Sequence, residues 1–187
     1  FTITTSYGSC TYEKFLPKII KKLTKEHSEM DSFSFEPYDV FSDGSKVYTY
    51  SNTYKYIYSY NDTLKCWDGY TSVSKENIFS SLDNIYTFST DIDIAPGMTF
   101  YNGKLYGLAT LSALTINNAP ALMRTFLICY NPEKSEWSYA EVPENITDMI
   151  NISFGIYNDS IYIAGGYNYY KKSFSTDVYT APINTFD

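Results

Sequence analysis

A repeated hairpin pattern constrains the fold of this 187-residue chain more than any other feature of its sequence. Three segments each read as an apolar strand, a polar turn and a second strand with a central tyrosine. They are "YDVFSDGSKVYTYS" (38–51), "MTFYNGKLYGLA" (98–109) and "ISFGIYNDSIYIAGG" (152–166), with turns at Asp43-Gly44, Asn102-Gly103 and Asn158-Asp159. These turn residues tolerate the positive φ of tight hairpins. The central tyrosines, Tyr48, Tyr106 and Tyr162, lie 58 and 56 residues apart, which indicates an internal repeat.

A second predicted hairpin follows the first in each unit and carries two aromatic residues seven positions apart. The pairs are Tyr60 and Trp67, Tyr130 and Trp137, and Tyr179 and Phe186. Two hairpins make four strands, and a repeated four-stranded sheet is the unit of a β-propeller. The composition agrees, because 19% of the residues are aromatic, and tyrosine on a strand covers apolar surface while its hydroxyl stays in water.

The third unit resembles a kelch repeat. An apolar strand ends in Gly165-Gly166, Tyr179 follows thirteen residues after Gly166, and Phe186 is expected on the next strand. The middle unit is similar through "CYNPEKSEW", whereas Ala109-Thr110 and Ser51-Asn52 replace the two glycines in the earlier units. This resemblance spans roughly residues 38 to 187. It implies an all-β, kelch-like propeller segment of about three four-stranded blades, in which glycines allow close approach and Tyr and Trp fill the space between sheets.

We expect one structural domain with five parts. They are an N-terminal strand and helix (1–37), a first blade (38–75), a long link with a candidate strand IYTFS (76–97), a second blade (98–143) and a third blade (144–187). The strand of the first part is predicted in "FTITTSYGS", and one short helix is predicted in "TYEKFLPKIIKKLTKEHSEM". Because propellers close with four to eight blades, the remaining blades are expected from the same full-length chain or from a second copy.

Charge and residue usage exclude several functional classes. A net charge of −7, with Arg124 as the single arginine, argues against nucleic-acid binding. No apolar run is long enough to span a membrane. His27 is the only histidine, so neither a Ser-His-Asp triad nor a multi-histidine metal site is expected, and we expect no cofactor.

Cys10, Cys66 and Cys129 have no metal-ligand spacing; they are expected to be buried thiols, with a Cys10–Cys66 bridge as the alternative in a secreted protein. The sequence leaves the cellular compartment open.

The favoured function is that of a non-catalytic module that binds a partner protein. Loops commonly carry binding sites, so the predicted rim loops 110–124 and 167–175 are the expected contact regions. The candidate binding residues in these loops are Tyr167, Tyr169, Tyr170, Asn117 and Asn118. Exposed tyrosines suit protein interfaces and also stack on carbohydrate.

The alternative is a glycan-binding or glycoside-hydrolase-like propeller that uses Asp91, Asp93 and exposed tyrosines. Asp91 and Asp93 lie two apart on a predicted strand and therefore share one face. A pair of carboxyl groups hydrolyses sugars when one of them stays protonated. "DVFSDGSKVYTY" and "APGMTFYNGKLYG" also resemble blades of five-bladed glycosidases, which place such carboxylates at the axis. The Pro-Glu expected for their acid residue reads Pro96-Gly97 here, so the sequence favours binding over catalysis.

Overall fold

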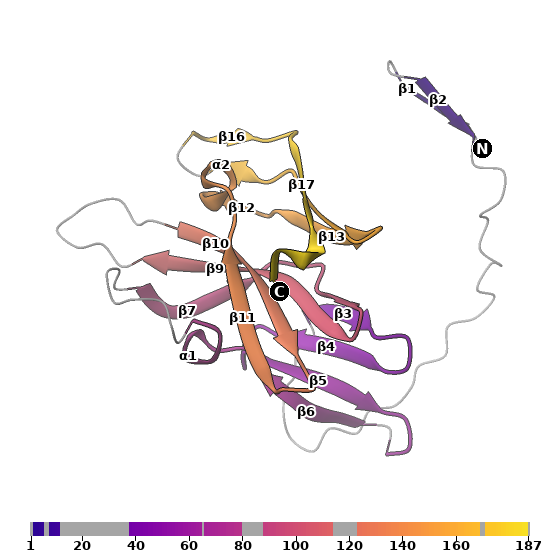
Figure 1. Ribbon diagram of the computed structural model, residues 1–187, viewed down its shortest axis with the longest axis vertical. Helices are drawn as coiled ribbons and strands as arrows, with labels where there is room; N and C mark the ends of the chain where they lie inside the picture. Colours follow the sequence, from indigo (N-terminus) through magenta and orange to yellow (C-terminus); the bar gives the residue numbers. More distant parts are fainter. Residues whose placement is uncertain are drawn as a thin grey trace.

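The computed structural model describes residues 2–5, 8–11, 38–64, 66–79, 88–113, 123–168 and 171–186. The fold is all-β, as the sequence predicts, and consists of antiparallel sheets that follow one another along the chain like the blades of a propeller (Figure 1). The strand predicted in residues 1–9 is instead a pair of short strands, β1 (Thr2–Thr5) and β2 (Gly8–Thr11). The helix predicted after it lies outside the described residues.

The first sheet is a four-stranded meander within the segment predicted as the first blade. Its strands, in spatial order, are β3 (Asp39–Ser42), β4 (Val47–Ser51), β5 (Tyr56–Asn61) and β6 (Cys66–Ser72). In the turn between β3 and β4, Asp43 Oδ1 accepts hydrogen bonds from the backbone N–H groups of Ser45 and Lys46. This turn therefore uses an aspartate side chain as well as the positive φ of Gly44.

The second sheet contains one more strand than the predicted blade. Its strands are β7 (Phe88–Ile94), β8 (Thr99–Tyr101), β9 (Lys104–Ala113), β10 (Met123–Asn131) and β11 (Glu136–Glu141). β7 and β8 both pair with the same edge of β9, β7 with its C-terminal half and β8 with its N-terminal half. The segment 76–97 is therefore not only a link, since β7 belongs to the second sheet. The predicted rim loop 110–124 is also shorter than expected, because β9 continues to Ala113 and β10 begins at Met123.

The third sheet has three strands among the described residues, where the sequence predicts four. β13 (Ser153–Tyr157), β14 (Ser160–Ala164) and β17 (Val178–Pro182) form it in that order. The predicted fourth strand is a 3-10 helix, η1 (Ile183–Phe186), which follows Pro182 at the end of β17. A small sheet beside it consists of β12 (Met149–Ile150), β15 (Tyr167–Asn168) and β16 (Ser173–Phe174).

Two single-turn helices complete the described secondary structure. α1 (Lys75–Ile78) begins at Ser74, whose Oγ accepts a hydrogen bond from Asn77 N, and α2 (Glu144–Thr147) precedes the small sheet. Within the described ranges, neither helix approaches the length that a transmembrane helix requires.

In the first two sheets, hairpin geometry explains the interval of seven residues between the paired aromatic residues. Tyr60 lies opposite Trp67 across β5 and β6, and Tyr130 lies opposite Trp137 across β10 and β11. Their ring centroids are 5.2 and 5.0 Å apart. In both hairpins an asparagine at the start of the turn accepts backbone N–H groups, which fixes the same turn length. The interval is thus a cross-strand pair.

The third unit does not keep this pairing. In the second sheet, the first aromatic residue of the pair, Tyr130, lies opposite Leu105, which precedes the central tyrosine Tyr106. In the third sheet, the corresponding residue Tyr179 lies opposite Ile163, which follows the central tyrosine Tyr162. Since Phe186 is in η1, the third occurrence of the interval is a correspondence in sequence without the same geometry.

Two hydrophobic clusters hold the three sheets together. The first lies between the first and second sheets and includes Tyr48, Tyr50, Leu105 and Ile128, with Trp137 packed against it. The second lies between the second and third sheets and is built from these buried residues: Leu108, Leu127, Ile146, Met149, Ile152, Ile161 and Ile163. We call the face of a sheet that is turned toward the following sheet its front face, and the opposite face its back face.

The glycine pair at residues 165 and 166 ends β14, and both residues have positive φ, +67° and +105°. A Cβ on Gly166 would lie 3.2 Å from both Ile152 Cγ1 and Met149 Cβ. The chain passes here directly against the small sheet. Gly166 is therefore a point of close approach, as glycine at the end of a strand often is.

Candidate functional site

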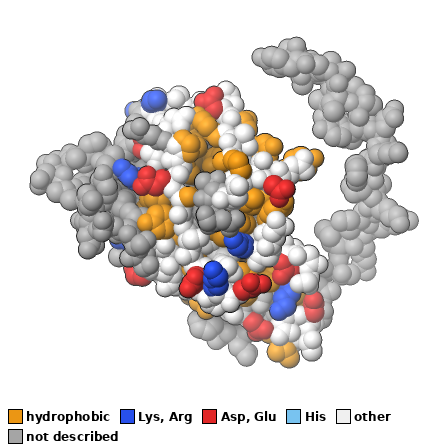
Figure 2. All heavy atoms as spheres, viewed as in Figure 1, with side chains coloured by type: hydrophobic (Ala, Val, Ile, Leu, Met, Phe, Trp, Pro, Cys, Tyr) orange, Lys and Arg blue, Asp and Glu red, His pale blue; other side chains and the backbone are white. Residues whose placement is uncertain are grey.

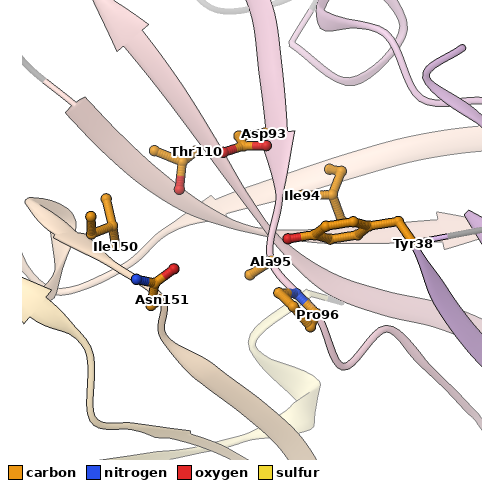
Figure 3. A pocket seen from close by; sticks show the side chains of 8 residues that line it. All are labelled: Tyr38, Asp93, Ile94, Ala95, Pro96, Thr110, Ile150 and Asn151. Carbon is orange, nitrogen blue, oxygen red and sulfur yellow. The ribbon is translucent and has the colours of Figure 1, made fainter. Parts of the chain in front are cut away.

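A cleft lies where the first sheet, the second sheet and the end of β12 converge, with a volume of about 180 Å³. Its lining residues are Tyr38, Asp93, Ile94, Ala95, Pro96, Thr110, Ile150 and Asn151. Figure 3 shows the Tyr38 hydroxyl directed toward the middle of the cleft, with Asp93 and Thr110 on one side and Ile150 and Asn151 on another. Of the individual residues predicted to bind or to act on a ligand, Asp93 is the one found in this lining, and Thr110 is the first residue of the predicted contact loop 110–124.

Asp93 reaches the cleft because β7 is held against both neighbouring elements. Lys55, in the turn after β4, donates from Nζ to the backbone carbonyl of Ile92 at 2.6 Å, which ties β7 to the first sheet. Immediately after β7, Ala95 N donates to Leu108 O at 2.9 Å. Ile92 and Ile94 are buried in the first cluster, so Asp93 between them points outward, as strand alternation requires.

A short row of polar side chains crosses the second sheet behind the carboxylate. Asp93 lies opposite Thr110, and Thr110 lies opposite Thr125. The hydroxyl oxygens of the two threonines are 3.0 Å apart and share a hydrogen bond. Asp93 is exposed and Thr110 is half-buried, so the cleft offers a carboxylate and a hydroxyl side by side.

The opposite wall contributes an aromatic ring and an amide. Tyr38 N donates to Tyr50 O at 2.8 Å, which continues the ladder of the first sheet, and its ring meets the Tyr50 ring edge to face. About half of the Tyr38 side chain remains exposed. Asn151 adopts a positive φ of 55°, which turns the chain sharply between β12 and β13 and leaves the amide exposed.

The side chain of Asp39, the residue next to Tyr38, links the first sheet to the second through hydrogen bonds. Its Oδ2 accepts the backbone N–H groups of Gly97 and Met98 at 2.8 and 3.1 Å, and its Oδ1 accepts Val40 N at 2.9 Å. These bonds join the first sheet to the strand break between β7 and β8. The Asp39 carboxylate is therefore used in fixing the wall that carries Tyr38.

Gly97 occupies the position where glycosidase-like blades were expected to carry a glutamate. Its φ is +103°, and a Cβ there would lie 3.0 Å from the backbone oxygen of Phe154. A side chain at this position would collide with the third sheet. A glutamate at this point would strain the backbone and crowd the Phe154 carbonyl, so this position disfavours a carboxylic acid.

Asp43, at the far end of the β3–β4 hairpin, has a strongly perturbed pKa. Burial alone would raise the pKa of this carboxyl, but hydrogen bonds from Tyr48 Oη and from Ser45 and Lys46 hold it well below its usual range. The same contact, added to burial, holds the pKa of Tyr48 well above its usual range. The group is engaged in the turn and lies outside the cleft lining.

The other predicted site residues are only partly within the described structure. Tyr169, Tyr170, Asn117 and Asn118 lie outside the described residues, and so does the side chain of Asp91, although β7 includes its backbone. Tyr167 is half-buried on β15, opposite the cleft residue Ile150, and its ring packs on Phe174 with centroids 5.0 Å apart. It lies beside Ile150 on the small sheet and is not part of the cleft lining.

Three cleft residues were not found from the sequence. Tyr38 and Thr110 sit at positions that the repeat pattern assigns to strand ends, where nothing distinguishes them from other polar strand residues. Asn151 carries one signal, an asparagine directly before a short apolar strand, which favours the left-handed conformation. Their convergence depends on how three separate sheets meet.

No cluster of three or more His, Cys, Asp or Glu side chains is present among the residues that the structure describes. Neither Cys66 nor Cys129 is in a disulfide, so the alternative bridge between Cys10 and Cys66 is not formed in this structure. Within the described lining of the cleft, Asp93 is the only carboxylate. Such a set can hydrogen-bond to a polar ligand, whereas two-carboxylate hydrolysis requires a second acid.

Comparisons with known proteins give little further information. No family model matches the sequence, and no curated protein matches it. Among solved structures, the chain is similar to a mutant of the GH43 protein BlXynB from Bacillus licheniformis, with 19% identity over 78% of this chain and a TM-score of 0.41. The match spans 31% of that chain's length. At this level the match carries no conclusion about activity, and the kelch resemblance has no support from a family model.

Proposed function

We propose that this protein is a propeller-like binding module that holds a carbohydrate in the cleft between Tyr38 and Asp93. The observation that carries the proposal is the composition of the lining. An exposed tyrosine ring suits the apolar face of a sugar, and the Asp93 carboxylate, Thr110 hydroxyl and Asn151 amide can hydrogen-bond to its hydroxyl groups.

The volume of the cleft limits the size of the ligand that it can hold. A volume of about 180 Å³ accommodates one sugar ring, well below the volumes of drug-sized pockets. The ligand therefore engages the cleft through one residue of a chain or through its end. With a single described carboxylate in the lining and a glycine in place of the expected acid, binding without hydrolysis is the reading that fits these residues.

A glycan array followed by calorimetric titration tests this proposal. Asp93→Asn replaces a hydrogen bond to a charged group, worth about 1.5–3 kcal/mol, with one to a neutral amide, worth about 0.5–1.5 kcal/mol, so we expect affinity to fall roughly five- to tenfold. Tyr38→Ala is expected to weaken binding further by removing the stacking surface. Glu133→Gln is the matched control, because it removes an exposed carboxylate in the β10–β11 turn, outside the cleft lining.

Two results would contradict the proposal. The first is that the wild-type protein binds no glycan on the array. The second is that a bound glycan is retained equally by Asp93→Asn and Tyr38→Ala. A reducing-sugar release assay on the glycans that bind separates binding from hydrolysis: turnover that disappears in Asp93→Asn would assign a catalytic role to this carboxylate.

A further inference from the structure

The front face of the third sheet has the residues of a sheet-packing interface but no sheet against it within the described structure. The evidence lies in equivalent positions of the three sheets. Tyr48, Tyr106 and Tyr162 lie opposite Phe41, Thr99 and Gly155 in the same hairpin register, so all three tyrosines are on front faces. Tyr48 and Tyr106 are each 4% exposed, whereas Tyr162 is 38% exposed.

The difference follows from what covers each tyrosine. The ring of Tyr48 packs on Phe100 of the second sheet, with centroids 4.8 Å apart. Tyr106 is buried on the face of the second sheet that is turned toward the third. No described sheet follows the third one, so Tyr162 remains open together with its neighbours Tyr157 and Val178.

The tyrosine at the start of each hairpin turn also differs between the second and third sheets in whether it contacts a following sheet. "YNGKLY" (101–106) and "YNDSIY" (157–162) place a tyrosine at the start of the turn in both sheets. The Tyr101 hydroxyl donates to Asp159 Oδ1 at 2.6 Å and so reaches the first turn of the following sheet. Tyr157 holds the equivalent position in the third sheet and is exposed. The third sheet thus presents both of the tyrosines with which the second sheet contacts its successor.

The front face of the third sheet is also free of charge. The residues of β13, β14 and β17 on this face include Ser, Gly, Tyr, Ala, Val, Thr and Pro, and none is acidic or basic. In the view of Figure 2, hydrophobic side chains are visible in the upper half, where the third sheet lies in Figure 1, with several acidic and basic side chains around them. Uncharged faces with exposed aromatic residues are typical of protein interfaces.

The chain also contains the matching surface, on the back face of the first sheet. Val40 and Val47 occupy the positions that Met98 and Leu105 occupy on the back of the second sheet. Met98 and Leu105 are 3% and 0% exposed because the first sheet covers them, whereas Val40 and Val47 are 63% and 42% exposed. The β3 and β4 residues of this back face are likewise uncharged.

We propose that the front face of the third sheet docks on the back face of the first sheet of a second copy of this chain. The contact joins two different surfaces, as successive sheets within the chain do. Two copies bring six sheets together, within the four to eight from which propellers close, and each copy then uses both of its open faces. In this arrangement Tyr162 packs on the cross-strand pair of Ser42 and Val47 in the second copy, the positions equivalent to Phe100 and Leu105, and Tyr157 lies at the turn between its β3 and β4.

Light scattering coupled to size-exclusion chromatography, at about 1–100 μM protein, tests the proposal. We expect a mass twice the 21.5 kDa of one chain. Tyr162→Asp on the front face and Val47→Lys on the back face are each expected to shift the protein to a monomer. Leu64→Asp is the control, since Leu64 is also an exposed apolar residue but lies in the turn between β5 and β6, on neither face; it is expected to leave the dimer intact.

A mixture of the two charge variants distinguishes this geometry from a symmetric contact of one face with itself. The Val47→Lys copy keeps an intact front face and the Tyr162→Asp copy keeps an intact back face. The mixed dimer therefore has one unchanged contact and one contact between substituted side chains of opposite charge, so mixing is expected to restore dimers that neither variant forms alone. A monomeric wild type, a dimer that survives both substitutions, or a mixture that stays monomeric would overturn the proposal. Circular dichroism identifies a variant that fails to fold, and Tyr157→Asp then replaces Tyr162→Asp.

Discussion

Backbone conformation explains the identity of several turn residues in this protein. Asn102 and Gly103, and Asn158 and Asp159, all have positive φ in the turns that the sequence marks. Gly97 is the residue with the greatest consequence for function. It follows the cleft residue Pro96, and its backbone N–H donates to Asp39 Oδ2. A side chain here would crowd the Phe154 carbonyl, which disfavours the acid that a glycosidase-like blade would carry at this position.

The Gly97→Ala substitution tests this reading. A Cβ at φ +103° and 3.0 Å from the Phe154 oxygen is expected to lower the free energy of unfolding by about 2 kcal/mol. Urea denaturation monitored by tryptophan fluorescence measures the change. Gly155→Ala is the control, because its Cβ would meet no atom within 4 Å and its φ is not positive, so we expect little change. Equal losses for the two variants would contradict the explanation.

Single strands and hairpins show how the aromatic content is used. The cross-strand pair of Tyr130 and Trp137 lies against the first cluster, and Trp137 Nε1 donates to the backbone carbonyl of Ser72 at 3.1 Å. Ser72 is the last residue of β6, so the last strand of the second sheet is bonded to the last strand of the first. Phe79, just after α1, extends the same packing by contacting Phe126 and Tyr139.

The contribution of this contact can be measured with Trp137→Phe. The variant keeps an aromatic ring but loses the N–H donor and leaves the Ser72 carbonyl unpaired, so we expect a loss of about 1–2 kcal/mol in the free energy of unfolding. Ser72→Ala should change it by less than about 0.5 kcal/mol, because the acceptor is the backbone and not the hydroxyl. Thermal denaturation of both variants separates the two cases; a larger effect of Ser72→Ala would show that another interaction holds the strands together.

Over the whole molecule, the second sheet is the central element, since it is covered on both faces. On β9, Leu105, Ala109 and Leu111 belong to the first cluster, while Leu108 belongs to the second. The third sheet is covered on one face only, and the outer edge of β17 is unpaired among the described strands. Stability is therefore expected to decrease from the second sheet toward β17.

Amide hydrogen exchange followed by mass spectrometry measures this gradient. Peptides from β9 and β10 should exchange more slowly than peptides from β17, because an amide that lacks a strand partner is exposed to water. Equally slow exchange of β17 and β9 in the monomeric Tyr162→Asp variant would contradict this gradient, whereas slow exchange of β17 in the wild type alone would reflect the cover that the proposed dimer supplies.

The sequence alone determined the local elements. Alternating apolar residues and turn-forming Asn, Asp and Gly specify where the hairpins of 38–51, 98–109 and 152–166 lie, because these signals act between residues a few positions apart. Tyr60 with Trp67 and Tyr130 with Trp137 were likewise predictable, since a fixed turn length makes a constant interval a cross-strand pair. The carboxylate Asp93 was found from its place in an alternating strand.

The tertiary structure decided what the pattern could not. The interval from Tyr179 to Phe186 is the same in sequence, yet residues 183–186 form a 3-10 helix, and β7 joins the second sheet although the repeat assigns it to a link. The cleft is the clearest case: Tyr38, Asp93 and Asn151 are far apart along the chain and meet only because three sheets converge. Which side chains share a surface depends on how sheets pack, and packing is a property of contacts between distant residues that no local pattern contains.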